Sequence, residues 1–170
     1  MSLSIFLFVV YFQAGSVDIN AVLTSAQGIS FRPDEIENVK SEIAGKNMDE
    51  VVTLAVNYVK GEGGVDKDGR KAAALLLIAA NAGHPDGQTR LGYLYHQGIG
   101  FVLSYKEAFG WVKKAAEQGY AKAEYNLGLM YGNGQGVALS NELASEWLRR
   151  AANNDYQEAK DVLKQLGEEW

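Results

Sequence analysis

The sequence predicts an all-α protein in which αα-hairpins stack into a solenoid, and three observations support this fold class. First, residues 86–121 align without a gap on residues 122–157, and a constant offset of 36 residues is typical of stacked helical units. The identical pairs include Leu91 with Leu127, Gly92 with Gly128, Tyr95 with Tyr131 and Trp111 with Trp147. Second, apolar residues recur at helical spacing through most of the chain. Third, only two of the 170 residues are proline, which suits helices.

The composition already argues against several classes of function and site. Hydrophobic residues make up 47% and charged residues 22%, so most of the chain should fold. A formal net charge of -5 argues against binding to the phosphate backbone of nucleic acids. The sequence has no cysteine, which excludes a disulfide framework, a thiolate zinc site and a cysteine nucleophile.

Residues 1–32 are predicted to hold an N-terminal apolar segment and a short helix. Leu3–Phe12 is apolar except for Ser4 and is too short to span a bilayer as a helix. It fits an export signal followed by the small residues Ala14–Ser16, but no Lys or Arg precedes it, and it fits a buried strand or helix of the domain equally well. Both interpretations stay open. Apolar residues at helical spacing then predict a helix within 18–27.

Residues 33–47 are predicted to form a degenerate half-repeat that caps the N-terminal end. Pro33 suits the first position of a helix, and Gly45 suits its end. Shifted by 36 residues, the apolar stripe of this helix takes the register of the second helix of a hairpin. The aligned pairs are Ile36 with Ala72, Val39 with Leu75 and Ile43 with Ala79.

Three full repeats are predicted at 48–85, 86–121 and 122–157, followed by a C-terminal capping helix in 158–170. First helices are expected at about 48–60, 85–97 and 121–131, second helices at about 68–83, 105–118 and 141–153, and the last helix at 156–166. Asn47, Ser104 and Ser140 suit N-cap positions. Trp111 and Trp147 should fill the space between hairpins.

The repeats resemble the Sel1-like repeat, a relative of the tetratricopeptide repeat. The resemblance is carried by LGYLYHQG at 91–98 with KEAFGWVKKAAEQG at 106–119, and again by LGLMYGNGQGV at 127–137. Val56 departs from the pattern by replacing the glycine of the first helix in repeat one, and Ser104 and Ser140 replace the usual aspartate. The resemblance covers 48–166 and implies a right-handed superhelix of hairpins that serves as a protein–protein adaptor, often in bacteria and often exported. It therefore favours a periplasmic or secreted protein over a cytoplasmic one.

No set of residues in the sequence suggests catalysis, a metal site or a cofactor site. His84 and His96 are the only histidines, and neither has a second metal ligand at helical spacing. The glycine-rich stretch 132–136 follows a predicted helix and lacks the strand that precedes a phosphate-binding loop. We therefore expect a non-enzymatic protein without a metal or cofactor.

Two surface features leave alternatives open. The cations Lys113, Lys114, Arg149 and Arg150 recur with the period on the second helices, and either form a solvated face, which we favour, or bind an acidic partner or anionic lipid. Leu103 and Leu139 occupy equivalent turn positions. They either fold back on their own hairpins or form an edge contact with a partner or a second copy of the chain.

The resemblance places the first helix of each hairpin on the concave face, and the period then gives three columns of variable residues across it. The columns are Thr53, Thr89, Tyr125 and Asp161; Asn57, Tyr93, Leu129 and Gln165; and Lys60, His96, Gly132 and Glu168. We expect an adaptor that binds a peptide or protein domain there, with Tyr93 and Tyr125 as anchors. The alternative is an immunity or inhibitor protein that caps a toxin or an enzyme. Membrane association and self-association stay open.

One further expectation concerns the second helix of repeat one. Leu77 and Ile78 stand where later repeats have Lys113, Lys114, Arg149 and Arg150, so 72–80 is apolar on nearly every face. Such a helix is normally buried. We expect residues before Pro33, including Phe6–Phe12, to cover it.

Overall fold

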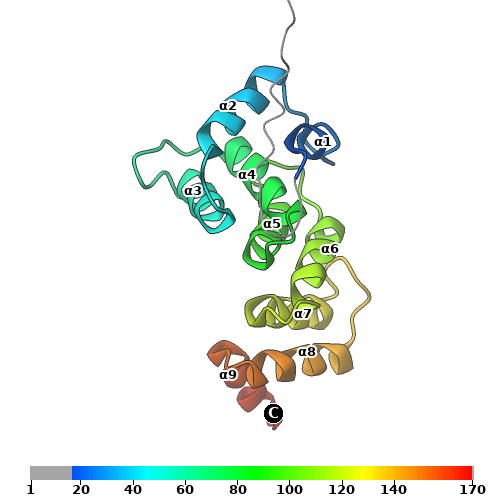
Figure 1. Ribbon diagram of the computed structural model, residues 1–170. Helices are drawn as coiled ribbons and strands as arrows, with labels where there is room; N and C mark the ends of the chain where they lie inside the picture. Colours follow the sequence, from blue (N-terminus) through cyan, green and yellow to red (C-terminus); the bar gives the residue numbers. More distant parts are fainter. Residues whose placement is uncertain (1–16, 170) are drawn as a thin grey trace, which may run out of the picture.

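The computed structural model describes residues 17–169, and within these residues every regular element is a helix (Figure 1). The helices of this part of the chain are α1 (Ile19–Thr24), α2 (Pro33–Ile43), α3 (Met48–Lys60), α4 (Gly69–Asn81), α5 (Pro85–Gln97), α6 (Tyr105–Ala116), α7 (Ala121–Asn133), α8 (Asn141–Asn153) and α9 (Gln157–Leu166). The all-α class is as predicted. Observed boundaries differ from the expected ones by a few residues at most, mainly at α1.

The helices from α3 onward form three antiparallel hairpins, α3–α4, α5–α6 and α7–α8, and α9 packs on the last of them. Each second helix also packs against the first helix of the next hairpin, so the hairpins stack in one direction from α3 to α9 (Figure 1). This arrangement is the predicted solenoid. Each hairpin buries its apolar side against its neighbours, as stacked repeats do.

Local sequence sets the helix ends. Asn47 Oδ1 accepts a hydrogen bond from the Glu50 backbone N–H, while the Glu50 carboxylate accepts one from the Asn47 N–H, a complete capping box. Ser104 and Ser140 also cap their helices as predicted, and each accepts a backbone N–H at 3.3 Å. At the start of α5 the cap is His84, whose Nδ1 accepts the Gly87 N–H while Nε2 lies 2.9 Å from Asp49 of α3. His84 therefore has a structural role.

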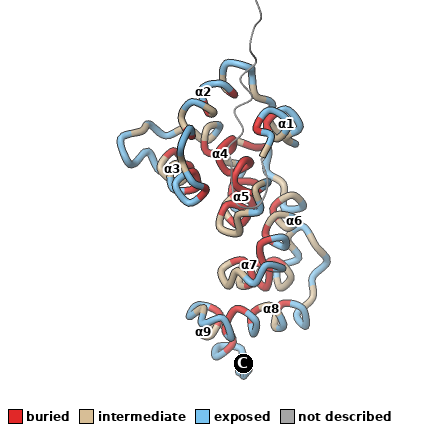
Figure 2. Tube along the Cα trace, in the orientation of Figure 1, coloured by how far each residue is buried: buried red, intermediate tan, exposed pale blue. Residues whose placement is uncertain are grey.

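The most deeply buried helix is α4, which is buried on every side from Ala72 to Ala80 (Figure 2). The short helix α1 packs against it and buries Ile19 and Leu23 in the same core cluster as Leu77 and Ile78. The expected covering of Leu77 and Ile78 by residues before Pro33 thus agrees with the position of α1. The part of that expectation that concerns Phe6–Phe12 lies outside the described residues.

The segment after α1 is also attached to repeat two. The Tyr95 hydroxyl of α5 donates a 2.8 Å hydrogen bond to the Gln27 carbonyl, and the Tyr95 ring stacks on Phe101 with centroids 4.0 Å apart. In repeat three the equivalent Tyr131 packs instead on Phe109 of α6. Repeat one has the smaller Ala73 at the position of Phe109. Next to Gln27, Gly28 lies beside the Tyr95 ring, and a Cβ built on it would lie 3.9 Å from Tyr95 Cε1.

Candidate functional site

The exposed surface of the first helices contains a hollow of about 340 Å³ between α5 and α7. Four of the predicted groove residues line it, namely Thr89, Tyr93, His96 and Leu129. Tyr93 is 53% exposed, a large value for a tyrosine in a packed helix. The structure therefore brings members of all three predicted columns together across the boundary between repeats two and three: Thr89 from the first, Tyr93 and Leu129 from the second and His96 from the third.

The floor of the hollow is formed by α6 through Ala108 and Val112. These residues can lie there because Gly92 of α5 has no side chain, and a Cβ built on Gly92 would lie 2.6 Å from Val112 Cγ2. The helices α5 and α6 therefore approach closely, and the buried side chains of Ala108 and Val112 form the base of the hollow between α5 and α7. With Met130 of α7 and Leu129 on the wall, the hollow is apolar at its base.

Amide side chains surround this apolar base. Gln97, Asn126, Asn133 and Gln135 line the hollow together with Tyr93 and His96, and its lining includes no Asp, Glu, Lys or Arg side chain. His96 is held in place by its ring, whose centroid lies 4.9 Å from that of Tyr105, and by Gln97, whose Nε2 lies 3.0 Å from its Nδ1. The site thus offers an apolar base and a rim of uncharged hydrogen-bonding groups.

Sequence reasoning did not find these amides because they lie outside the three columns. Asn126, for example, aligns with Arg90 in repeat two, which forms an ion pair with Asp86 at 2.7 Å and points to another role for that position. A signal was nevertheless present. Asn126 and Asn133 are seven residues apart, which places them on one face of α7.

Other predicted groove residues lie outside the hollow or contribute little surface to it. Thr89 is buried and its hydroxyl donates to the Pro85 carbonyl. Tyr125 packs sideways on Tyr156, with ring centroids 5.2 Å apart. In repeat one, the Thr53 hydroxyl donates to the Asp49 backbone carbonyl, Lys60 forms an exposed ion pair with Glu62 at 3.5 Å, and the Asn57 side chain lies against Gly63.

At the turns between the two helices of a hairpin, apolar side chains remain exposed. Leu103 is 51% and Leu139 62% exposed, and Val102 next to Leu103 is exposed as well. Each leucine also lies next to a glycine of its own hairpin, since a Cβ built on Gly98 would lie 3.5 Å from Leu103 Cβ and one built on Gly134 would lie 3.4 Å from Leu139 Cβ. An edge contact with a partner or a second copy stays a prediction. The turns form an apolar edge, defined here as Val102, Leu103 and Leu139.

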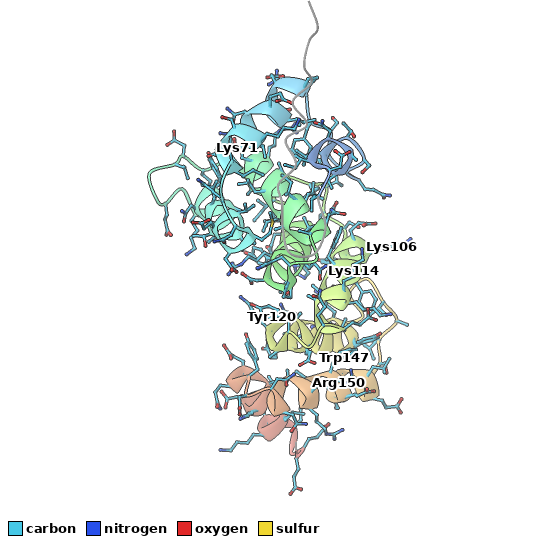
Figure 3. All side chains as sticks on the ribbon, viewed as in Figure 1. Lys71, Lys106, Lys114, Tyr120, Trp147 and Arg150 are labelled. Atoms are coloured by element: carbon cyan, nitrogen blue, oxygen red, sulfur yellow. The ribbon has the colours of Figure 1, made fainter. Side chains whose placement is uncertain are left out.

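The basic residues of the second helices are partly neutralised by neighbours within the chain. Lys113 pairs with Glu117 at 3.7 Å, Arg149 with Glu168 at 2.7 Å and Arg150 with Glu146 at 3.2 Å. Lys114 lies over the ring of Trp111 at 4.0 Å. Arg150 lies over the ring of Trp147 at 4.5 Å, and Figure 3 labels both of these residues. These contacts fit a solvated face better than a free cationic surface.

A second hollow, of about 490 Å³, lies between α2 and the start of α4. Its main charges are already matched, since Arg70 contacts the Glu35 carboxylate at 3.2 Å and the Ser30 carbonyl at 2.7 Å. The backbone N–H of Arg32, and next the Arg70 side chain, hold the pKa of Glu35 below its usual range. Arg70 therefore acts as a clamp between α4 and the stretch before α2.

The described residues contain no group of three or more His, Asp or Glu side chains that could hold a metal ion. Within the same part of the chain, no helix is long and apolar enough to cross a membrane.

Three consecutive stretches of the chain match one known repeat family. The Sel1 repeat family model matches residues 54–84, 85–120 and 121–156. The chain belongs to the Sel1 repeat family. Sel1 repeat proteins are generally scaffolds for protein–protein interaction and are generally not catalytic. A search of curated proteins gave no match.

Two solved Sel1-type structures are similar to this chain. The crystal structure of a Sel1 repeat protein from Oxalobacter formigenes is 32% identical, covers 76% of this chain and 97% of its own, and has a TM-score of 0.64. A protective antigen of uropathogenic Escherichia coli strains that displays an SLR fold is 31% identical, with a TM-score of 0.63. That match covers 69% of this chain and 25% of the antigen.

Proposed function

We propose that this Sel1 repeat protein is a non-enzymatic adaptor that holds a peptide segment in the hollow between α5 and α7. One observation carries the proposal: an exposed Tyr93 and a half-buried Leu129 line a hollow whose base is formed by the buried apolar residues Ala108, Val112 and Met130. Exposed tyrosine beside a shaped apolar hollow is typical of binding hot spots.

The chemistry of the hollow favours an uncharged segment with one apolar side chain. Burying an Asp or Lys of the ligand against Val112 and Met130 without an ionic partner would be costly, because the lining supplies no opposite charge. The amides of Asn126 and Asn133 can instead satisfy the backbone N–H and C=O groups of an extended chain. The hollow also suits the size of one large side chain and its flanking peptide groups better than a whole domain.

Selection from a library of displayed random peptides on the wild-type protein, followed by titration of the best binder, tests this proposal. Tyr93→Ala should weaken binding by about 1–3 kcal/mol, or roughly 5- to 150-fold, with unchanged helical content. Leu166→Ala is the matched control, because Leu166 is also exposed but lies on α9 outside the hollow. Equal binding by wild type and Tyr93→Ala would rule the hollow out as the site.

An inhibitor that caps a toxin or an enzyme would use the same family scaffold differently. It would engage a broad face, so Tyr93→Ala and Leu166→Ala would both have small effects on binding.

A further inference from the structure

The apolar edge carries a charge pattern that complements itself. Lys106 follows Leu103 by three residues in the first turn of α6, and Glu142 follows Leu139 by three residues in the first turn of α8. The two positions are equivalent in the repeat, since 36 residues separate them. Both side chains are exposed, and neither forms an ion pair in the part of the chain that the structure describes; Lys106 is labelled in Figure 3.

The two turns also lie side by side. The backbone of Gly136, in the turn between α7 and α8, packs on the carbonyl of Tyr105 at the start of α6. A Cβ built on Gly136 would lie 3.0 Å from the backbone nitrogen of Lys106. The turn that holds Leu139 is therefore adjacent to the start of α6 that follows Leu103. Leu103 and Leu139 with Lys106 and Glu142 thus belong to one edge of the stack.

We propose that this edge pairs two copies of the chain in an antiparallel, two-fold arrangement. A two-fold axis between the two turns brings repeat two of one copy against repeat three of the other. Leu103 then contacts the second copy's Leu139, Lys106 faces its Glu142, and both contacts occur twice. A parallel side-by-side arrangement would instead place Lys106 against Lys106, so the charges select the antiparallel one.

This proposal is independent of peptide binding in the hollow, because it uses different residues. The apolar area is small, so the dimer is weak and depends on concentration. The occupant is a second copy because both halves of the charge pair occur on this one edge. A foreign partner gives no reason for opposite charges at equivalent positions.

Charge reversal tests the arrangement in the full chain by sedimentation velocity. Wild type should form a dimer as its concentration rises toward about 1 mM. Lys106→Glu alone and Glu142→Lys alone should each raise the dissociation constant at least tenfold, because each places like charges together at both contacts. An equal mixture of these two variants should form a heterodimer in which both contacts again pair opposite charges.

Two matched controls reverse charge on α9, away from the edge. Lys164→Glu and Glu158→Lys, both at exposed positions, should dimerise as wild type does. The proposal is wrong if wild type is monomeric at about 1 mM, or if mixing the two edge variants restores nothing. A dimer that Leu103→Lys plus Leu139→Lys disrupts but charge reversal does not would overturn the antiparallel geometry.

Discussion

Two glycines, Gly92 and Gly128, lie where the helices of a hairpin come closest. A Cβ on Gly92 would lie 2.6 Å from Val112 Cγ2 and 3.1 Å from the Ala108 carbonyl oxygen. On Gly128 it would lie 2.9 Å from Leu148 Cγ and 3.0 Å from the Ala144 carbonyl oxygen. The same backbone positions recur in both repeats, so close approach is a requirement of the hairpin itself.

Replacing either glycine by alanine should therefore destabilise the protein. We expect Gly92→Ala and Gly128→Ala to lower the free energy of unfolding by about 1–3 kcal/mol in urea titrations, since the second helix must move away. Gly110→Ala is the control. Gly110 lies inside α6 with nothing within 4 Å of its added Cβ, so its better helix propensity should stabilise by up to about 1 kcal/mol. Equal effects at all three positions would contradict the account.

Tyr95 makes stability depend on alkaline pH. Burial, aided by the charge of Glu107, raises the pKa of Tyr95 to about 12 from its usual 10. Because folding raises this pKa, the protonated Tyr95 contributes to the stability of the fold. This contribution is complete below pH 10 and is lost as the pH rises toward 12. Burial, with Asp86 nearby, likewise raises the pKa of Tyr120 to about 12.

The free energy of unfolding should thus fall steeply between pH 10 and pH 12, and Tyr95→Phe should flatten this fall. At neutral pH the variant should be less stable by about 1 kcal/mol, because the Gln27 carbonyl loses its donor. Urea titrations across this pH range measure both effects. If the free energy of unfolding falls with pH as steeply in Tyr95→Phe and Tyr120→Phe as in wild type, neither tyrosine causes the fall.

At the scale of elements, α1 packs on α4, which has no solvent-exposed face of the kind that the later second helices have. The α4 helix carries Leu77 and Ile78 where α6 carries Lys113 and Lys114, and both leucine and isoleucine are buried. The attachment of α1 is therefore a condition for keeping α4 out of water. Leu23, fully buried on α1, is the residue to change.

Leu23→Ala should lower the free energy of unfolding by about 2–5 kcal/mol if α1 stays packed. The decrease should be smaller if α1 detaches and leaves α4 uncovered. In the second case, binding of a hydrophobic dye should rise before global unfolding. Thr24→Ala, at the exposed neighbouring position, is the control for both readouts. Wild-type stability together with wild-type dye binding would show that α1 is not needed.

The elements were largely predictable because local signals set them. Asn47, Ser104 and Ser140 cap helices as expected, and the pattern around Leu77 and Ile78 predicted a covered helix. The surface was less predictable, because the period gives the face of a helix but not which neighbour reaches it. Tyr125 shares a column with Thr53, yet it packs on Tyr156 because α9 follows α8 closely.

The same limit applies to the site. The columns placed Tyr93, His96 and Leu129 on one surface, but not the depth of the hollow, which depends on how closely α6 approaches Gly92. Asn126 and Asn133 line the hollow, and their place in it could not be predicted without knowing its depth. Exposure of Leu103 and Leu139 could not be read from their positions either, since the turn could have folded over them.

Across the whole molecule, the core is unevenly distributed. One buried cluster extends from Ile19 to Met130, whereas the C-terminal end has a separate small cluster around Leu148 and Leu163. A solenoid is stabilised mainly by contacts between neighbouring repeats, so its end with fewer such contacts opens first.

Native-state hydrogen exchange should therefore show the amides of α9 exchanging first and those of α4 last. The expected order follows from burial: α9 buries Ala159 and Leu163, whereas α4 is buried throughout from Ala72 to Ala80. A common exchange rate for all helices would mean a single cooperative unit, contrary to this expectation.

The most direct test of the central claim maps the bound peptide on the whole molecule. With the selected peptide added, heteronuclear NMR should show shift changes that cluster at Tyr93, His96 and Leu129 and at the amides of Asn126 and Asn133. The outer residues Lys114 and Arg150 should keep their free-state shifts. Changes centred on Lys114 and Arg150, with none at Tyr93 or Leu129, would contradict the proposal that the hollow between α5 and α7 is the binding site.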